Sequence, residues 1–406
     1  MRTLKKRVRT LRSHNRSRSI HVCLVSSFPP SYHSLSDENY NLVKAFSRNP
    51  RISKITVLAD FIDREEVLVD KKVDIIRCWK LNNIFASLSM IKKVYELKPD
   101  IVYYNLILRH FSSNRFINFL GYLAMVFIKK VLRNSVVVTL HNLGEPEAFD
   151  ISIIGYRYSF INKLGIRLAT KLILKADVVT FPHQHLVDLA KKKYNAKNVI
   201  YISNGLSEEP VLDSKLGYKR LLIFGRMGPY KGLETTLQAF RWVVNQDKEV
   251  KLIVAGVSHS EHPGFLESLL KKYSEIPNIE LTGYVPESEI RNIFTSCTAV
   301  LLPYKMSVWS SGVFLLACTY GRPVIASDLP DFKELVKQGA GIFLFPVGDS
   351  ERLAKAMESI LNEKGLQKRL GDANLKWAKK SSTIEQTTNR LVEIFEQLTG
   401  KKLRGG

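Results

Sequence analysis

A glycine-rich turn at residues 224–232, with the sequence FGRMGPYKG, carries two cations in a setting suited to phosphate binding. An apolar, strand-like run ends at Gly225, and an amphipathic helical pattern begins near Gly232. Ligands of open α/β sheets bind beyond the carboxyl ends of the strands, and a helix N-terminus presents free amide groups to an anion. Arg226 and Lys231 add fixed positive charge. The turn therefore predicts a diphosphate site. Its spacing is neither GxGxxG nor that of a P-loop, so an ordinary strand–helix turn with two exposed cations is the alternative.

A second group of candidate side chains lies in the first half of the chain. His141 follows the strand-like run SVVVTL, where it could act as a general base or hydrogen-bond a substrate; the alternative is a satisfied histidine in a strand–loop turn. Glu145 and Glu147 follow within six residues and are alternative bases. Asp37 and Glu38, in the first long loop SYHSLSDENY, are weaker catalytic candidates.

Two histidines, His183 and His185, stand two residues apart in FPHQH. The neighbouring sequence offers them no further metal-ligand group. We therefore expect them to be surface or cleft residues and not a metal site. The four cysteines are scattered without metal-ligand or redox spacing, which is typical of reduced core thiols in the cytoplasm.

Two series of strand-like runs, alternating with helical patterns, must position these side chains. The first series is 21–28, 52–60, 73–79, 100–105, 135–142, 177–182 and 198–205. The second is 219–225, 250–256, 279–285, 299–304, 322–328 and 341–346. Such alternation predicts an α/β protein with two Rossmann-like, doubly wound domains facing a central cleft. The length of 406 residues also favours two domains.

We place the domain boundaries from changes in composition. Residues 1–19 form a basic arm, 20–205 the first Rossmann-like domain and 206–382 the second. The stretch 204–219, rich in turn residues, is a plausible linker. After Ser350 the pattern is strongly helical, and residues 383–400 are expected to cross back and pack on the first domain.

The net charge of +23 predicts a polyanionic partner. Residues 1–20 contain eight cations and no acid, yet the rest of the chain keeps a balance of +15, so the excess is not confined to a solubilising tail. The basic arm lacks interleaved aromatic residues and any known motif, so we expect no specific nucleic acid. An anionic membrane surface fits better.

The segment FINFLGYLAMVFIKKVLR, residues 116–133, has apolar residues at helical spacing and cations at one end. It is either a core helix or an interfacial helix that dips into lipid. Its apolar run of 13 residues is too short to span a bilayer, and no secretory signal is evident at the N-terminus. We therefore expect a cytoplasmic protein, peripheral on the inner face of the membrane.

Several motifs, in order, resemble those of GT-B glycosyltransferases of group 1 (family 4). The stretch GRMGPYKG resembles the family's Gly-Arg…Lys-Gly donor motif, and ISNGL at 202–206 resembles its interdomain Asn-Gly. LIVAG at 252–256 and NIELTGYVPESEI at 278–290 resemble the next two elements. SSGVFLLACTYGRPVIASDLPDFKELV resembles the signature region, and GIFLFPVGDSERLAKAM resembles the strand and helix after it. The resemblance covers residues 200–360 well and the first half loosely.

The resemblance implies a nucleotide-sugar in the second domain and an acceptor in the first. Arg226 and Lys231 would hold the donor diphosphate in place of a metal, so neither metal nor cofactor is expected. The remaining donor-binding candidates are Gly225, Gly256, Ser310, Ser311, Gly312 and Glu334. Serine at a helix start is also an ordinary N-cap, and Glu334 either contacts ribose or caps the helix expected from Phe332. A histidine in the position of His141 is frequent in the family, so His141 and Glu145 are the expected catalytic residues.

The chain departs from the family at its paired glutamates. Leu316 stands where the second is usual and Val308 near the first. Their absence leaves ribose contact, sugar positioning and the retaining or inverting outcome open. The leading hypothesis is a hexosyltransferase that uses a UDP- or GDP-sugar and a lipid-linked or cell-surface glycan acceptor. The alternatives are a nucleotide-sugar 2-epimerase and a non-catalytic GT-B protein that binds membrane or glycan.

Overall fold

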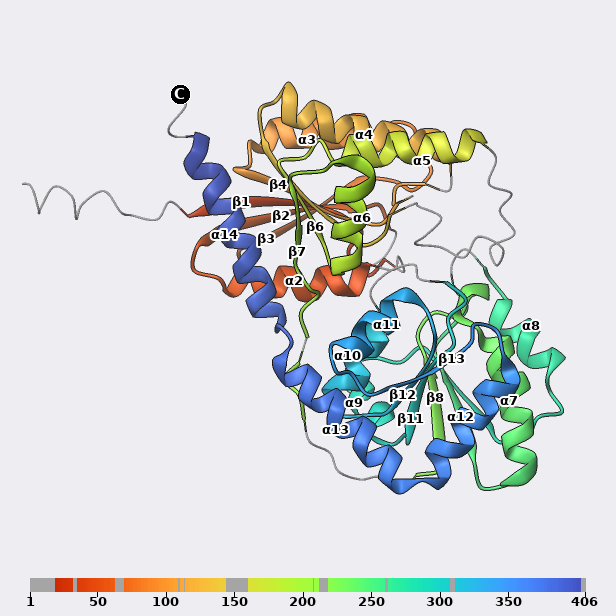
Figure 1. Cartoon of the computed structure of the whole chain (residues 1–406). Helices are drawn as coiled ribbons and strands as arrows, with labels where there is room; N and C mark the ends of the chain where they lie inside the picture. The colour runs from red at the N-terminus through yellow and green to blue at the C-terminus, as the bar shows by residue number, and fades with distance from the viewer. Residues whose placement is uncertain are drawn as a thin grey trace, which may run out of the picture.

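The computed structural model describes residues 19–31, 35–62, 69–108, 110–112, 114–143, 160–206, 208–211, 218–259, 262–306 and 311–402. In these ranges the chain forms two parallel sheets, one of seven strands and one of six, each covered by helices (Figure 1). The predicted α/β fold with two Rossmann-like halves is confirmed, and we call them the N-half and the C-half.

The N-half sheet has the order β3-β2-β1-β4-β5-β6-β7. Its strands are β1 (Ile20–Val25), β2 (Ile52–Asp60), β3 (Val73–Trp79), β4 (Ile101–Leu106), β5 (Ser135–Leu140), β6 (Val178–Phe181) and β7 (Val199–Tyr201). Each neighbouring pair is parallel, so all carboxyl ends lie at one edge. The chain reverses its direction of winding between β1 and β4, and ligands bind at such switch points.

Apolar helix faces cover both sides of this sheet. On one side lie α3 (Ala86–Leu97), α4 (Arg115–Lys130), α5 (Phe160–Ile173) and α6 (Gln184–Tyr194). On the other lie α2 (Ser36–Arg48) and α14 (Ile384–Lys402). The strands are buried on both faces, which explains why β4 and β5 read as unbroken apolar runs.

The C-half sheet has the order β10-β9-β8-β11-β12-β13 and switches between β8 and β11. Its strands are β8 (Arg220–Phe224), β9 (Lys251–Ala255), β10 (Ile279–Gly283), β11 (Ala299–Leu302), β12 (Val324–Ser327) and β13 (Ile342–Phe345). Its helices are α7 (Leu233–Gln246), α8 (Phe265–Lys272), α9 (Glu287–Thr295), α10 (Gly312–Thr319), α11 (Pro330–Lys337), α12 (Ser350–Asn362) and α13 (Lys364–Lys380).

The last helix, α14, belongs to the N-half although it follows the C-half in sequence (Figure 1). Phe395 is fully buried, and its ring centroid lies 5.8 Å from that of Phe46 on α2 and 5.7 Å from that of Tyr103 on β4. The chain passes between the halves twice, near Leu206 and near Ile384. These two segments are hydrogen-bonded to each other, since the Ile384 amide donates to the Leu206 carbonyl at 2.9 Å. The predicted return of the C-terminal helix is thus confirmed.

Helix α4 fits both interpretations of its sequence. Tyr122, Met125 and Ile128 are buried against the sheet, whereas Phe116 and Phe127 are 58% and 41% exposed. Among the described residues, no helix is long and apolar enough to cross a bilayer.

Candidate active site

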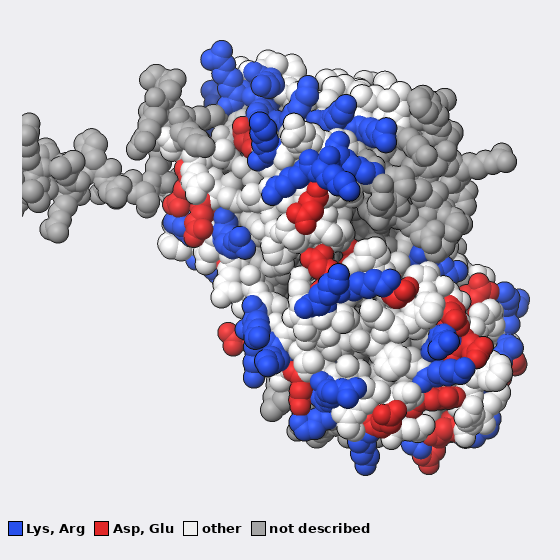
Figure 2. Space-filling model, in the orientation of Figure 1, with Lys and Arg blue, Asp and Glu red and all other residues white. Residues whose placement is uncertain are grey.

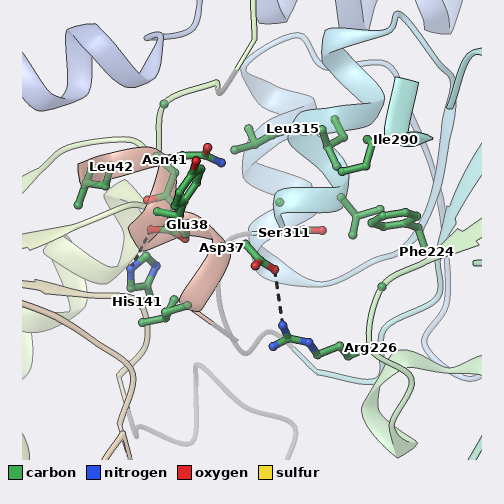
Figure 3. A pocket seen from close by; sticks show the side chains of 18 of the residues that line it. Asp37, Glu38, Asn41, Leu42, His141, Phe224, Arg226, Ile290, Ser311 and Leu315 are labelled. Atoms are coloured by element: carbon green, nitrogen blue, oxygen red, sulfur yellow. Dashed lines mark hydrogen bonds and ion pairs between the residues drawn. The ribbon is translucent and has the colours of Figure 1, made fainter. Parts of the chain in front are cut away.

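A cavity of about 610 Å³ lies where the carboxyl edges of the two sheets face each other. The N-half contributes the first turn of α2 and His141, which follows β5. The C-half contributes the turn after β8 and the first turn of α10 (Figure 3). The cavity therefore brings together side chains from both expected site regions.

The glycine-rich turn forms the cationic wall. The Lys231 side chain is only 8% exposed, and its Nζ donates to the Tyr304 hydroxyl at 2.9 Å. The Arg226 guanidinium lies 3.5 Å from the Asp37 carboxylate, which reaches across from the N-half (Figure 3). The wall therefore holds two cations with their charged ends at the cavity.

Two of the three glycines predicted at the donor site, Gly225 and Gly256, have different roles in packing. Gly225 lines the cavity with φ 107°, a conformation that other residues rarely adopt. Gly256 lies against it, and a Cβ at Gly256 would collide with the Gly225 carbonyl. The close approach of these backbones keeps the cavity floor free of side chains.

The first turn of α10 forms the neighbouring part of this wall. Ser311 is the N-cap, and its hydroxyl accepts a hydrogen bond from the Phe314 amide at 3.2 Å. It also lies 3.1 Å from the Tyr304 hydroxyl, so it joins the same network as Lys231. Ser311 and Gly312 line the cavity, whereas Ser310 lies outside the described residues. Capping by Ser311 is observed, and its contact with a ligand stays a prediction.

An apolar surface surrounds Leu316, where the resemblance leads us to expect a glutamate. Leu316 lines the cavity together with Phe224, Val313 and Leu315. Val308, near the position of the first glutamate, is outside the described residues. In this part of the cavity a ligand would meet hydrocarbon and backbone groups.

His141 forms the opposite wall together with Glu38. The imidazole is 1% exposed, and its Nε2 lies 2.7 Å from Asn105 Oδ1 and 3.3 Å from Glu38 Oε1. Asn204, the asparagine of the ISNGL motif, donates to the other Glu38 oxygen at 3.3 Å. These contacts hold a carboxylate at the cavity surface, with side-chain exposure of 30% (Figure 3).

The structure corrects the expected setting of two acids. Asp37 and Glu38 belong to the first turn of α2 and not to a loop. Acids are favourable at this end of a helix, which explains why this sequence begins a helix there. Glu145 and Glu147 lie outside the described residues, so their catalytic role stays untested.

Glu334 and the histidines of FPHQH meet beside the cavity but are not among its lining residues. His185 Nδ1 lies 2.8 Å from Glu334 Oε2, and its Nε2 lies 3.1 Å from Asp331 Oδ1. Burial by itself would lower the pKa of His185, but these hydrogen bonds outweigh it and raise the pKa to about 9. Burial lowers the pKa of His183. The expectation that no ligand group lies near these histidines was wrong, because the two acids come from the other half.

Two residues that position side chains of the cavity could not be recognised from local sequence. Tyr304 holds Lys231 and Ser311, and Asn105 holds His141. Asn105 lies near the end of β4 and Tyr304 follows β11, and both strands adjoin the switch points of their sheets. This position at the carboxyl edge was the one sequence feature that could have identified them.

The two walls together can support displacement of a phosphate leaving group. Cations and helix-end amides on one side can stabilise negative charge that develops on a diphosphate. A carboxylate on the other side can accept a proton from an attacking hydroxyl.

A comparison with protein families matches residues 207–377 to the family described as glycosyl transferases group 1. Among curated proteins, the chain is 36% identical over 108 residues to a GDP-mannose:glycolipid 4-beta-D-mannosyltransferase of Xanthomonas campestris, covering 26% of this chain and 30% of that one. It is 28% identical over 180 residues to a phosphatidyl-myo-inositol mannosyltransferase of Mycobacterium leprae, covering 42% and 46%. The alignments thus span less than half of these relatives.

Solved structures with the same fold cover nearly the whole chain. Sucrose-phosphate synthase from Thermosynechococcus elongatus superposes with a TM-score of 0.75 over 94% of this chain and 100% of that one, at 15% identity. Anabaena HepE, in complex with UDP and glucose, superposes with a TM-score of 0.68 over 92% and 99%, at 16% identity. The chain therefore has the GT-B fold, and its residues 207–377 match the model of the glycosyl transferase group 1 family.

Proposed function

We propose that this protein transfers a hexose from a UDP- or GDP-linked sugar to a hydroxyl of a glycan intermediate, lipid-linked or at the cell surface. The observation that carries the proposal is the pair of facing walls. Arg226, Lys231 and the start of α10 stand on one side, and Glu38 with His141 stands on the other. This arrangement separates the leaving group from the base across a single cavity.

On the donor side, the two cations hold the diphosphate. Lys231 is positioned by Tyr304, and Arg226 exchanges its contact with Asp37 for a bidentate contact with phosphate oxygens. Free amides of Gly312 and its neighbours add partial positive charge. The nucleoside lies against the apolar surface around Phe224 and Leu316. These groups supply the charge neutralisation that a divalent metal would otherwise provide.

On the acceptor side, Glu38 is the general base. Its carboxylate takes the proton of the acceptor hydroxyl while that oxygen bonds to the anomeric carbon. The bond from the anomeric carbon to the diphosphate breaks, and the nucleotide leaves with the electron pair. Because base and leaving group occupy opposite walls, attack comes from the face opposite the leaving group and the anomeric centre inverts. His141 and Asn204 position the carboxylate.

An apolar groove on the N-half supports an acceptor at a membrane. It has a volume of about 600 Å³, lies between α3 and α4, and includes Phe85 and Leu88, which are 67% and 62% exposed. Lys130 lines its edge, and Lys and Arg side chains gather around this part of the molecule (Figure 2). The names of two relatives mention a glycolipid and phosphatidyl-myo-inositol. We assign the groove to an anionic bilayer at the inner face of the membrane.

The test of the donor site is a panel of UDP-, GDP-, ADP- and CMP-sugars, read by thermal stabilisation and by slow donor hydrolysis. One nucleotide class should stabilise the wild type. Arg226→Ala and Lys231→Ala should each weaken binding by roughly 10- to 100-fold, because a charge-assisted hydrogen bond contributes about 1.5–3 kcal/mol. Lys355→Ala is the control, since this exposed cation on α12 is paired with Glu351.

The possible results separate the hypotheses. Stabilisation and hydrolysis by one donor, lost in the two variants and kept in the control, support the transferase. Formation of a 2-epimeric sugar would instead identify the epimerase. If no donor binds, the glycine-rich turn is an ordinary turn and the non-catalytic alternative replaces our proposal.

A further inference from the structure

Four side chains from the two halves meet beside the cavity. His183 and His185 come from the N-cap and first turn of α6, and Asp331 and Glu334 come from the first turns of α11. The two helices approach each other across the boundary between the halves (Figure 1). One potential ligand atom from each of His183, His185 and Glu334 lies within 4.8 Å of the others. This is a mixed set of nitrogen and oxygen donors and not a simple acidic cluster.

We propose that His183, His185 and Glu334 form a binding site for a divalent transition-metal ion shared by the two halves, with Zn²⁺ as the best-fitting ion. Two imidazoles and one carboxylate are a known three-ligand set for Zn²⁺, with a fourth position left for water. Imidazole ligands disfavour Mg²⁺ and Ca²⁺, which prefer oxygen atoms. The site is separate from the cationic wall that contains Arg226 and Lys231. Metal binding there is a further function, independent of the proposed transfer reaction.

The position of Asp331 completes the arrangement. A histidine that binds metal through one nitrogen usually donates its other N–H to a carboxylate, which fixes the ring. Asp331 Oδ1 lies 3.1 Å from His185 Nε2, while Nδ1 faces Glu334 at 2.8 Å. The metal binds on the Nδ1 side, between His185 and Glu334, and Asp331 acts as the positioning residue.

Admitting the ion requires the ligand side chains to shift, because the ligand atoms of His183, His185 and Glu334 lie within 4.8 Å of one another. Ligand atoms on a tetrahedral Zn²⁺ lie about 3.3 Å apart, given bonds of roughly 2.0–2.1 Å. The observed 2.8 Å between His185 Nδ1 and Glu334 Oε2 must therefore open by about half an ångström. Their side chains are 30% and 19% exposed, so the ion reaches the site from solvent.

The experiment uses the full chain, freed of metal with a chelator, and contains no nucleotide-sugar. Co²⁺ is titrated and followed by its visible absorption, and Zn²⁺ is then added as competitor. The wild type should bind one equivalent of Co²⁺ and lose it to Zn²⁺. His183→Gln and His185→Gln should each weaken binding at least roughly 100-fold, and Asp331→Asn should weaken it by roughly 10-fold or more.

The control is His262→Gln, since His262 lies outside this cluster and should leave metal affinity unchanged. Circular dichroism of the chelated variants checks that each is folded. A Zn²⁺-dependent rise in Tm, present in wild type and control and absent in His183→Gln, is the second readout. If the wild type binds no stoichiometric Co²⁺, or if the cluster variants bind as the wild type does, the contact is only a set of hydrogen-bonded side chains between the halves and the proposal fails. Either result leaves the donor-binding test untouched.

Discussion

At the scale of single residues, the proposed mechanism depends on the contact between Glu38 and His141. Glu38→Gln keeps the shape of the side chain but cannot accept the proton of the acceptor. We expect kcat to fall by roughly 10²- to 10⁴-fold while the Kd of the nucleotide-sugar stays within about threefold. Transfer rates with saturating donor and calorimetric donor binding measure the two quantities.

The matched control for this prediction is Glu208→Gln. Glu208 also lines the cavity, but its carboxylate accepts a hydrogen bond from the Tyr320 hydroxyl at 2.7 Å and has no contact with His141. Transfer by this variant should stay close to wild type. Equal losses in both variants, or an unchanged kcat in Glu38→Gln, would remove Glu38 from the role of base.

The sequence predicted some residues of the candidate site and missed the contacts of others. Gly225, Arg226 and Lys231 were predicted because they lie in one short motif that follows a strand, and Ser311 because it lies in a second such motif. The partner of His141 was not, because Glu38 reaches it only when α2 covers the edge beside β4 and β5. Contacts between distant segments depend on packing that no local pattern encodes.

At the scale of elements, α2 extends one acidic side chain across the cavity. Asp37 is 79% exposed and lies 3.5 Å from the Arg226 guanidinium, where a donor diphosphate would otherwise bind. Asp37→Asn removes a competing anion, and exposed ion pairs contribute about 0.2–1 kcal/mol. We therefore expect donor affinity to increase by roughly two- to fivefold, an effect opposite in sign to that of Arg226→Ala.

Calorimetry with UDP or GDP at low and high salt measures this change. The gain should shrink at high salt, because the competing ion pair is screened. Asp74→Asn is the control, since Asp74 pairs with Lys54 on the N-half sheet, away from the cavity lining. Weaker binding in Asp37→Asn would instead mean that this carboxylate helps to hold the donor.

The elements themselves were largely predictable. Each expected strand is present within the described residues. These strands could be predicted because parallel strands buried on both faces have short, continuous apolar sequences. The helix containing FINFLGYLAMVFI could not be assigned to core or surface from sequence, since it has both an inward and an outward apolar face. Only the position of α3 beside it shows that the outward face forms a groove.

At the scale of the whole molecule, two Rossmann-like halves act as opposing walls. Their number and order can be derived from the strand patterns, but their relative orientation depends on contacts such as Arg226–Asp37 and His185–Glu334. Helix α14 packs on the N-half, where its Phe395 contacts Phe46 of α2. In the proposed mechanism, this geometry places the donor-binding groups and the acceptor-binding groups on separate halves.

The assignment of the α3/α4 groove to a membrane gives the last prediction. Binding of the full chain to vesicles with anionic lipid should exceed binding to neutral vesicles and should fall with salt. Phe85→Ser/Leu88→Ser removes two exposed apolar side chains, each worth about 1.5–3 kcal/mol on full burial, so vesicle affinity should drop by roughly tenfold or more. Trp242→Ser on α7, whose side chain is 63% exposed, is the matched control and should bind as wild type.

If the double variant binds as tightly as wild type and only salt matters, the basic arm and body attract the vesicle without the groove. That result would withdraw the groove from the acceptor site and leave the donor chemistry intact.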